Sequence, residues 1–197
     1  MNKPTKGKSA RVFFALWPDE TERSALAAWQ PTLHKICGGR IMRAATLHAT
    51  LVFLGDVELC RLEALQLAAQ EVAGEPFDLV LEAARYWGHN QIVYAAPSFV
   101  PRQLAQLVRD LEQRLSKHRF RFERHAYEPH VTLLRNARWG GTPKVGNPLP
   151  AEGWAELTPF LPEGGRVTWR ARSYALVQSA PDGQGANYSV LARFALR

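Results

Sequence analysis

The chain lacks the features that mark several large classes of protein. Only 2 of its 197 residues are cysteines, and Cys37 and Cys60 match no metal-ligand spacing and need not form a disulfide. No apolar run approaches the length of a membrane-spanning helix. A glycine-rich loop of the Walker type and a His-x-x-x-His pair are also missing. These absences argue against a disulfide scaffold, a membrane span, an ATP-binding loop and a histidine metal site, and so few cysteines suit the reducing cytoplasm.

Acidic residues are scarce relative to basic ones. The 25 lysines and arginines outnumber the 18 aspartates and glutamates, which leaves a formal net charge of +7 at pH 7. A basic protein attracts polyanions, so this balance favours a partner such as a nucleic acid without establishing one. The hydrophobic fraction of 46% is that of a globular protein, and the length suits one domain of two small lobes. Residues 1–10 are basic and polar without the apolar core of a signal peptide, so we expect a disordered tail ahead of one domain over residues 11–197.

Alternating apolar runs and amphipathic stretches predict a mixed α and β protein. A helix is expected over residues 21–36, where Pro31 is positioned to kink or divide it. Further helices are expected over residues 59–72 and 101–118, where leucines recur at helical spacing. Strands are expected over residues 11–17, 47–54, 77–86, 91–96, 130–135, 155–161, 166–178 and 188–196. We expect Gly55 to end the second of these strands, and a loop over the glycine- and proline-rich residues 139–150.

One short pattern occurs twice in this framework. The segments 48–51 (HATL) and 130–133 (HVTL) both read His-x-Thr-Leu, in a chain that has only 6 histidines. An apolar strand and a helix precede each copy, and these two strands end at Trp17 and Ala96. Two halves of the same design would place the two patterns on opposite walls of one cleft.

The residue types in this pattern suit chemistry on a phosphate ester. Residues i and i+2 of a strand point to the same face, so His48 lies beside Thr50, and His130 lies beside Thr132. Histidine titrates near neutrality, so one imidazole can accept a proton while the other donates one. Threonine hydroxyls can donate hydrogen bonds to the phosphoryl oxygens. The pattern therefore predicts His48 and His130 as catalytic residues, and Thr50 and Thr132 as phosphate-binding residues.

The same alternation assigns the neighbours of each pattern. Ala49, Leu51 and Phe53 are expected on the core face of their strand. Arg135 lies five residues after His130, at the end of the second strand, where a guanidinium is a candidate for pairing with the substrate phosphate. Single histidines and threonines on strands are more often structural, and an arginine at a strand end is often only solvated.

Other residues leave alternatives open. Residues 114–124 (RLSKHRFRFER) suit either an RNA contact or a helix end with a solvated basic face. Arg40 and Arg43 precede the first pattern and are candidate phosphate guides. Trp87 and Phe53 have the chemistry to stack on a terminal base or to pack in the core. The histidines without a motif partner are His34, His89, His118 and His125.

In these stretches the chain resembles the 2H phosphoesterase superfamily, which is named for its two His-x-Thr/Ser motifs. Within that superfamily it resembles the bacterial RNA 2′,3′-cyclic phosphodiesterases, also called 2′-5′ RNA ligases. The resemblance runs from about Arg11 to Arg197. Ala49 departs from the pattern, because many relatives carry a larger aliphatic residue there. The matching segments are 11–16 (RVFFAL), 47–56 (LHATLVFLGD), 129–135 (PHVTLLR), 174–179 (YALVQS) and 188–191 (YSVL).

The resemblance implies an α+β fold that is bilobal and duplicated, with two antiparallel sheets forming a central cleft and the helices outside. It implies an enzyme without metal or cofactor that opens a terminal 2′,3′-cyclic phosphate on RNA with water and leaves a 2′-phosphate. By analogy, His48 is the acid that protonates the departing O3′, and His130 is the base that activates the water. It also implies reversible 2′-5′ ligation without ATP, partners such as the cyclic-phosphate ends of tRNA halves, a monomer, and a cytoplasmic location.

Two rival functions remain open from the sequence. The same cleft would suit a phosphodiesterase for small cyclic nucleotides or a nuclease that trims RNA tails. A module that binds nucleotides or RNA without catalysis is the other alternative. The basic charge balance favours polymeric RNA over a small ligand, and intact histidines in both motifs argue against a loss of catalysis.

Overall fold

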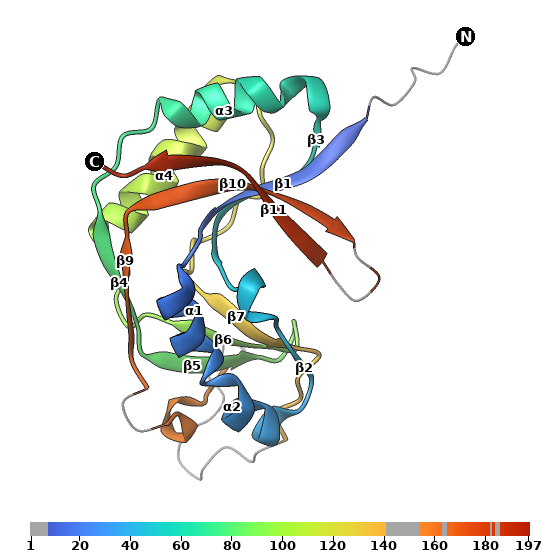
Figure 1. Cartoon of the computed structure of the whole chain (residues 1–197), viewed down its shortest axis with the longest axis vertical. Helices are drawn as coiled ribbons and strands as arrows, with labels where there is room; N and C mark the ends of the chain where they lie inside the picture. Colours follow the sequence, from blue (N-terminus) through green and yellow to red (C-terminus); the bar gives the residue numbers. More distant parts are fainter. Residues whose placement is uncertain (1–7, 141–153, 163–164, 182, 184–185) are drawn as a thin grey trace.

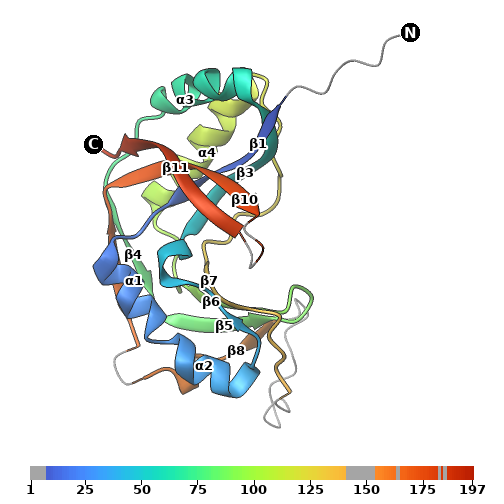
Figure 2. The same ribbon diagram turned by 45° about the vertical axis from the view of Figure 1, so that its right-hand side comes forward.

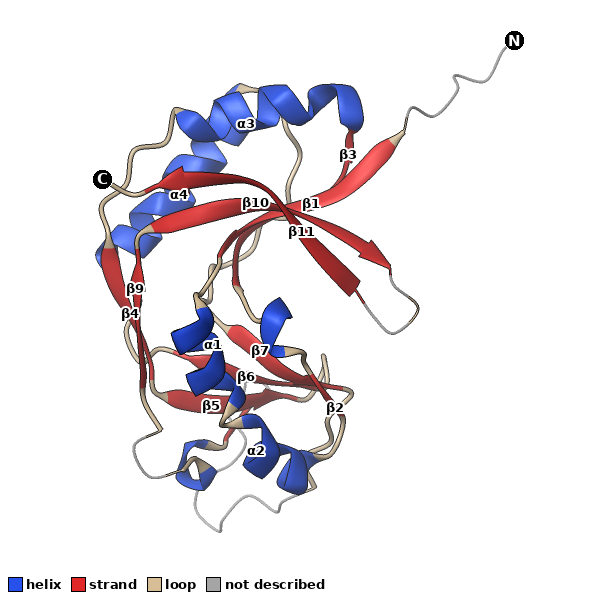
Figure 3. Cartoon of the chain, viewed as in Figure 1, coloured by secondary structure: helices blue, strands red, loops and turns tan. Residues whose placement is uncertain are grey.

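The computed structural model describes residues 8–140, 154–162, 165–181, 183 and 186–197. These residues form an α+β fold in which every strand pairing is antiparallel (Figures 1 and 3). Nine strands make one large sheet, and two more make a small one. The path through the large sheet is β11-β10-β1-β3-β7-β6-β5-β8, with β2 (Arg40–Ile41) paired to β7. The other strands on this path are β1 (Ser9–Leu16), β3 (Ala49–Glu58), β5 (Ala83–Trp87), β6 (Ile92–Ala96), β7 (Val131–Arg135), β8 (Trp154–Glu156), β10 (Ser173–Pro181) and β11 (Ala186–Ala195).

The large sheet consists of two halves that meet at β3 and β7. Ala49 opposite Val131 is the register pair that joins them, and each is the middle residue of its His-x-Thr motif. On one side of this junction follow β1, β10 and β11, and on the other follow β6, β5 and β8. The predicted duplication is confirmed by this matched order, and the junction lies where the two motifs meet. The buried Ala49 faces Val131 across it.

Two of the helices pack on the half of the large sheet that does not contain the strand preceding them in sequence. The half that holds β1, β3, β10 and β11 is the upper one in Figure 1, and the half that holds β7, β6, β5 and β8 is the lower one. After β1 the chain forms α1 (Glu20–Ala27) and α2 (Gln30–Cys37), and α2 packs on β2 and β7 in the lower half. It leaves β6 in the lower half and forms α4 (Arg102–Lys117), which packs on β3 in the upper half together with α3 (Leu62–Gln70). Figure 2 shows the two pairs at opposite ends of the molecule. This exchange ties the two halves together.

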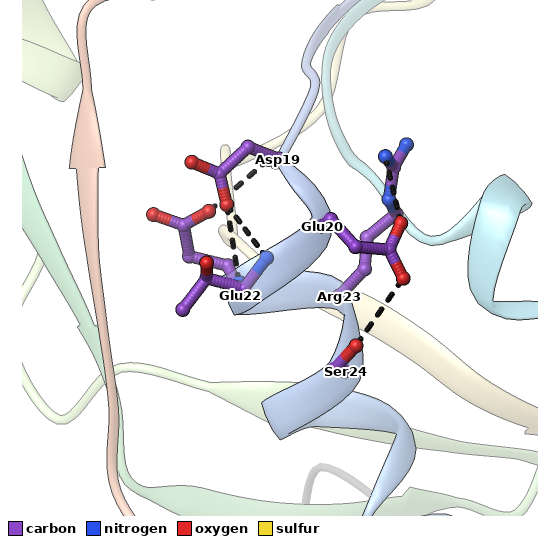
Figure 4. A network of polar contacts seen from close by, with 6 residues as sticks. Asp19, Glu20, Glu22, Arg23 and Ser24 are labelled. Atoms are coloured by element: carbon purple, nitrogen blue, oxygen red, sulfur yellow. Dashed lines mark hydrogen bonds and ion pairs between the residues drawn. The ribbon is translucent and has the colours of Figure 1, made fainter.

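The helix predicted over residues 21–36 is two helices. α1 begins at a capping box, in which the Asp19 carboxylate accepts hydrogen bonds from the backbone N–H groups of Thr21 and Glu22, and the Glu22 carboxylate accepts one from the N–H of Asp19 (Figure 4). Pro31 lies in the first turn of α2, where a missing N–H leaves no hydrogen bond unmade. Pro31 therefore divides the helix.

Two of the predicted strands are each two strands, because the chain passes from one sheet to the other partway along them. The predicted strand 77–86 breaks at Glu82 into β4 (Phe77–Leu81) and β5, and the predicted strand 166–178 breaks at Arg172 into β9 (Val167–Ala171) and β10. β4 and β9 pair with each other in the small sheet, whereas β5 and β10 belong to opposite halves of the large one. The small sheet thus bridges the halves, on the left in Figure 1.

Other boundaries also differ from the predictions. Gly55 does not end its strand: with a φ of 71° it follows a bulge at Leu54, and β3 continues to Glu58. The predicted strand 155–161 is the short β8 followed by a 3₁₀ turn over Thr158–Phe160. β1 begins at Ser9, two residues before the predicted domain boundary, and residues 1–7 of the predicted tail and 141–150 of the predicted loop lie outside the described residues. Two further 3₁₀ turns span Ala44–Thr46 and Leu59–Arg61.

The main core lies between the sheet and the helices. The face of α4 predicted from leucine spacing is buried, with Leu104, Leu107, Leu111 and Leu115 at most 1% exposed. Both β3 and β7 contribute to the same core through the residues that alternate with their polar pairs. None of the helices in the described part of the chain is long and apolar enough to cross a membrane.

Candidate active site

Both His-x-Thr pairs open onto one cavity at the junction of the two halves. A cavity of about 70 Å³ is lined by His48, Thr50, His130 and Thr132, together with Arg135. Its other lining residues are Met42, Thr46 and Tyr188. The five residues singled out from the sequence are therefore brought together within reach of a single small group: Thr50 lies in β3, Thr132 and Arg135 lie in β7, and each histidine immediately precedes its strand.

The two histidines are held in the same way. The Nδ1 of His48 lies 2.7 Å from the carbonyl oxygen of Thr46, and the Nδ1 of His130 lies 2.9 Å from that of Glu128. In each case the carbonyl belongs to the residue two positions earlier. A carbonyl only accepts hydrogen bonds, so Nδ1 carries the hydrogen in both rings. That leaves Nε2 of each histidine as the nitrogen that can accept or donate a proton.

A matching bulge follows each motif. In the pairing of β1 with β3, the partner of Phe14 is Val52 and the partner of Ala15 is Thr50, so Leu51 is the extra residue. In the pairing of β6 with β7, Leu133 is the extra residue in the same way. A bulge shifts the alternation of a strand by one residue. The fourth residue of the His-x-Thr-Leu pattern therefore marks the point where the strand changes phase.

This change of phase decides which residues face the cleft. Leu133 and Leu134 are both buried in the main core, and Arg135 then lies on the same face as His130 and Thr132. Without the bulge, a residue five positions after His130 would point to the other face. The equivalent position in the first motif is Phe53, which packs in the cleft-side cluster with Phe13. The prediction that Phe53 lies on the core face is therefore wrong, and the bulge is the reason.

Aromatic rings support both histidines. His48 stacks on Trp17 with ring centroids 5.4 Å apart, Phe13 lies tilted against it at 4.9 Å, and Tyr188 meets it edge-on at 5.1 Å. His130 lies edge-on to Trp87 at 4.9 Å and to Tyr94 at 5.6 Å. These contacts fix the plane of each ring and keep water from its sides.

Burial and positive neighbours disfavour charge on the two imidazoles. The pKa of His48 is lowered to about 4, mainly by burial; its hydrogen bond to Thr46 opposes this, and the charges of His130 and Arg135 add to it. The pKa of His130 is also lowered, again mainly by burial, while its hydrogen bond to Glu128 and the Glu128 carboxylate oppose the shift. Arg135 lowers the pKa of both rings. Without a bound anion, the site therefore carries the positive charge of Arg135, and both imidazoles favour the neutral form.

The lowered pKa of His48 predicts acid-sensitive folding. Below pH 6.5 the unfolded chain takes up a proton on His48 that the folded protein accepts only near pH 4, so this residue costs stability as the pH falls through that window. The loss by pH 4 is about 2–3 kcal/mol. His48→Asn keeps a donor for the Thr46 carbonyl and should lose that much less free energy of unfolding between pH 7 and pH 4 in denaturant titrations. The same change at the exposed His125 is the control, and equal pH slopes for wild type and His48→Asn would contradict the assignment.

A larger cavity adjoins the central one. It measures about 900 Å³ and shares His130, Thr132 and Arg135 with the small cavity. Trp87, His89 and His125 lie along it, together with Glu123 and Glu128. Of the candidates that the sequence left open, Trp87, His89 and His125 thus border the cleft.

The other candidates that the sequence left open, Arg40, Arg43 and the basic residues of 114–124, line neither the central cavity nor the large one. The Arg43 guanidinium donates to the backbone oxygen of Ala186 at 2.8 Å, and Arg40 sits opposite Arg135 in the pairing of β2 with β7. In the basic stretch 114–124, Arg114 and His118 both contact Glu71 at the end of α3, at 3.0 and 2.8 Å. Those contacts favour the structural interpretation for the helix end.

The two cavities are also lined by residues that the sequence did not single out as site residues. Met42, Thr46 and Tyr188 line the central cavity and Arg11 lines the large one. Tyr188 comes from β11, and Arg11 lies two residues before Phe13 on β1. Their place in the cleft depends on how β1, β10 and β11 pair, which residue spacing alone does not reveal. Among the described residues, no three His, Cys, Asp or Glu side chains gather as metal ligands would.

The sequence and the fold match known proteins over most of the chain. A family model for the 2′-5′ RNA ligase superfamily matches residues 17–156, which include both motifs. The RNA 2′,3′-cyclic phosphodiesterase of Escherichia coli (strain K12) is 31% identical over 145 residues, covering 74% of this chain and 80% of that protein. The RNA 2′,3′-cyclic phosphodiesterase of Bacillus subtilis (strain 168) is 26% identical over 136 residues, covering 66% and 67%.

A solved structure agrees with these sequence matches. The crystal structure of E. coli LigT complexed with 3′-AMP superposes with a TM-score of 0.77 at 25% identity, covering 96% of this chain and 99% of that one. The predicted fold class is thus confirmed over nearly the whole chain. With both His-x-Thr motifs inside the matched region, the chain belongs to the 2′-5′ RNA ligase superfamily.

Proposed function

We propose that this protein is an RNA 2′,3′-cyclic phosphodiesterase, which opens a terminal cyclic phosphate with water and leaves a 2′-phosphate. The observation that carries this proposal is the small cavity lined by two His-x-Thr pairs and Arg135. Its family membership supports the same reaction, because two curated relatives bear that name.

The proposed reaction is an in-line displacement at phosphorus. Nε2 of His130 accepts a proton from a water molecule, whose oxygen attacks the phosphorus. The P–O3′ bond breaks, and Nε2 of His48 donates a proton to the departing O3′. The products are a 2′-phosphomonoester and a free 3′-hydroxyl. His130 ends protonated and His48 neutral, and proton exchange with solvent restores both.

The other lining groups act on the charge of the phosphate. The Thr50 and Thr132 hydroxyls donate to its non-bridging oxygens, where negative charge builds up in the transition state. The Arg135 guanidinium pairs with the same oxygens. None of these three groups has to exchange a proton, so binding and proton transfer are divided between different side chains.

The lowered pKa of His48 sets a condition on this mechanism. An acid must carry its proton at the start, yet the pKa of about 4 leaves His48 neutral in the free protein near pH 7. A bound phosphate anion favours the imidazolium form of both rings. We therefore propose that the negative charge of the bound substrate raises the pKa of His48, so that His48 is protonated in the complex.

A ribose 5′-hydroxyl in place of water would give a 2′-5′ linkage with the same division of roles. Cleavage of that linkage back to the cyclic phosphate would exchange the roles of the two histidines. The cyclic phosphate is already strained and activated, so the joining step consumes no ATP. We propose ligation as a second, reversible reaction of the same cavity.

The test of the proposed function is the structure of the product. An RNA oligonucleotide with a 2′,3′-cyclic phosphate end should be converted to one with a 2′-phosphate, which phosphorus NMR and chromatography against synthetic standards distinguish from the 3′-phosphate. Formation of the 3′-phosphate, or no turnover, would contradict the proposal.

Removal of metal ions should leave the activity unchanged. Every step above uses side chains of this chain, so we expect the rate in excess chelator to equal the untreated rate within about twofold. The measurement compares initial rates with and without chelator after extensive dialysis. Loss of activity that a divalent ion restores would require a different mechanism.

We further propose that the protein acts as a monomer in the cytoplasm, on RNA ends such as those of cleaved tRNA. The monomer is tested by sedimentation at working concentration. Cell fractionation tests the location, and sequencing of cyclic-phosphate ends that accumulate in a deletion strain tests the substrate.

A further inference from the structure

We propose that the bound RNA continues from the central cavity along the cleft face of β1, and that Arg11 binds a backbone phosphate on the 5′ side of the reacting nucleotide. This inference rests on the proposed function and adds to it a specificity for polymers over cyclic mononucleotides. It follows from three cavities in series.

The cavities are linked by shared residues. The central cavity of about 70 Å³ and the large one of about 900 Å³ share His130, Thr132 and Arg135. The large cavity and a third one of about 460 Å³ share Arg11. The three cavities thus adjoin one another in order, from the two histidines to Arg11 and beyond. Their combined volume far exceeds what the small group held between the histidines needs.

Arg11 is held in this series of cavities by aromatic contacts that lead back to His48. Its guanidinium carbon lies 4.7 Å from the centroid of the Phe53 ring. Phe53 lies 6.4 Å from Phe13, whose ring is 4.9 Å from that of His48. Arg11 and Phe13 share a face of β1, two residues and about 7 Å apart along the strand. The cation is therefore oriented by the same row of rings that supports the catalytic histidine.

The charge of Arg11 is available to a ligand. Within the described part of the chain, no carboxylate lies within ion-pair distance of its guanidinium, although Asp56 is its register partner on β3. The side chain is exposed. An arginine on an aromatic face keeps its planar set of donors free at the edge, which is the geometry that binds phosphate.

The remaining lining suits the rest of an RNA backbone. Beyond Arg11 the third cavity is lined by Ser9, Asp56, Gln178 and Ser179, whose side chains can hydrogen-bond to ribose hydroxyls. The large cavity also holds Glu123 and Glu128. Carboxylates accept hydrogen bonds from hydroxyls and base amines but repel phosphates. Phosphate contacts along this series of cavities are therefore favoured at the two arginines, Arg135 at the reacting end and Arg11 further along.

The test compares turnover of cyclic-phosphate-ended substrates that are one to four nucleotides long. Wild type should show a rise in kcat/KM when the chain first becomes long enough to reach Arg11. Arg11→Met keeps the packing on Phe53 and removes the charge. We expect it to lower kcat/KM about tenfold for the longer substrates only, and to leave the cyclic mononucleotide unaffected. The slope of log kcat/KM against log salt should fall by about 1 for the tetranucleotide.

Controls separate this binding role from a structural one. Arg11→Lys keeps the charge and should retain most of the length preference, whereas Arg102→Met, an exposed arginine on α4 outside all three cavities, should behave as wild type. If Arg11→Met lowers the rates of all substrates equally, or changes none of them, the inference is overturned. If the wild-type protein opens none of the four cyclic-phosphate substrates, the proposed function is overturned instead.

Discussion

His130→Ala is expected to lower kcat on a cyclic-phosphate-ended RNA by about 10²–10⁴-fold, and His48→Ala by a similar factor. Each substitution removes one of the two Nε2 atoms that face the central cavity, while the threonines and Arg135 remain to bind the phosphate. Binding of the RNA should therefore survive. Initial rates and an equilibrium binding assay on the same preparations measure the two effects.

The two histidines should also behave as a unit. Once one proton transfer is lost, removal of the second costs less than it would alone, so the double variant should be little slower than either single variant. His118→Ala is the matched control, because His118 lies at the end of α4 and contacts Glu71. Wild-type turnover in either motif variant, or an equal loss in the control, would refute the catalytic assignment.

A substrate with sulfur in place of O3′ is expected to restore His48→Ala but not His130→Ala. The bond that breaks is then P–S3′, and a thiolate leaves without being protonated because the pKa of a thiol is near 8.5, far below that of an alcohol. The variant that lacks the acid should recover about 10²-fold or more relative to its rate on the oxygen substrate. The variant that lacks the base should stay slow, because water must still lose its proton.

This comparison decides the roles of the two histidines independently of the family resemblance. Wild type on both substrates is the reference, since its rate should change far less than that of His48→Ala. Rescue of His130→Ala instead would reverse the two roles. Rescue of neither would mean that the departing oxygen is not protonated by either histidine.

Spacing within a strand was enough to predict the motif residues. Because strand residues alternate between faces, His48 with Thr50 and His130 with Thr132 had to share a side wherever the strands lay. The strand–helix–motif pattern around Trp17 and Ala96 also indicated two similar halves, and the matched strand order confirms them.

Spacing failed where the backbone departs from ideal alternation. Arg135 and Phe53 reach the cleft only because Leu51 and Leu133 are bulged, and a leucine in an apolar strand carries no sign of a bulge. Spacing also does not predict the break at Glu82, because the single run 77–86 looks like one strand although its two parts belong to different sheets. Arg11 and Tyr188 were missed because β1 and β11 become walls of the cleft only through pairings between distant parts of the chain.

The measurement that tests the central claim most directly is a histidine ¹⁵N NMR titration of the protein with and without a bound 2′-nucleotide. Two imidazoles that hold one phosphate between their Nε2 atoms must both gain positive charge more readily when the anion is present. The pKa of His48, about 4 in the free protein, and the lowered pKa of His130 should therefore both rise on binding, and both Nε2 signals should shift. A rise at only one histidine, or at neither, would show that they do not share a phosphate.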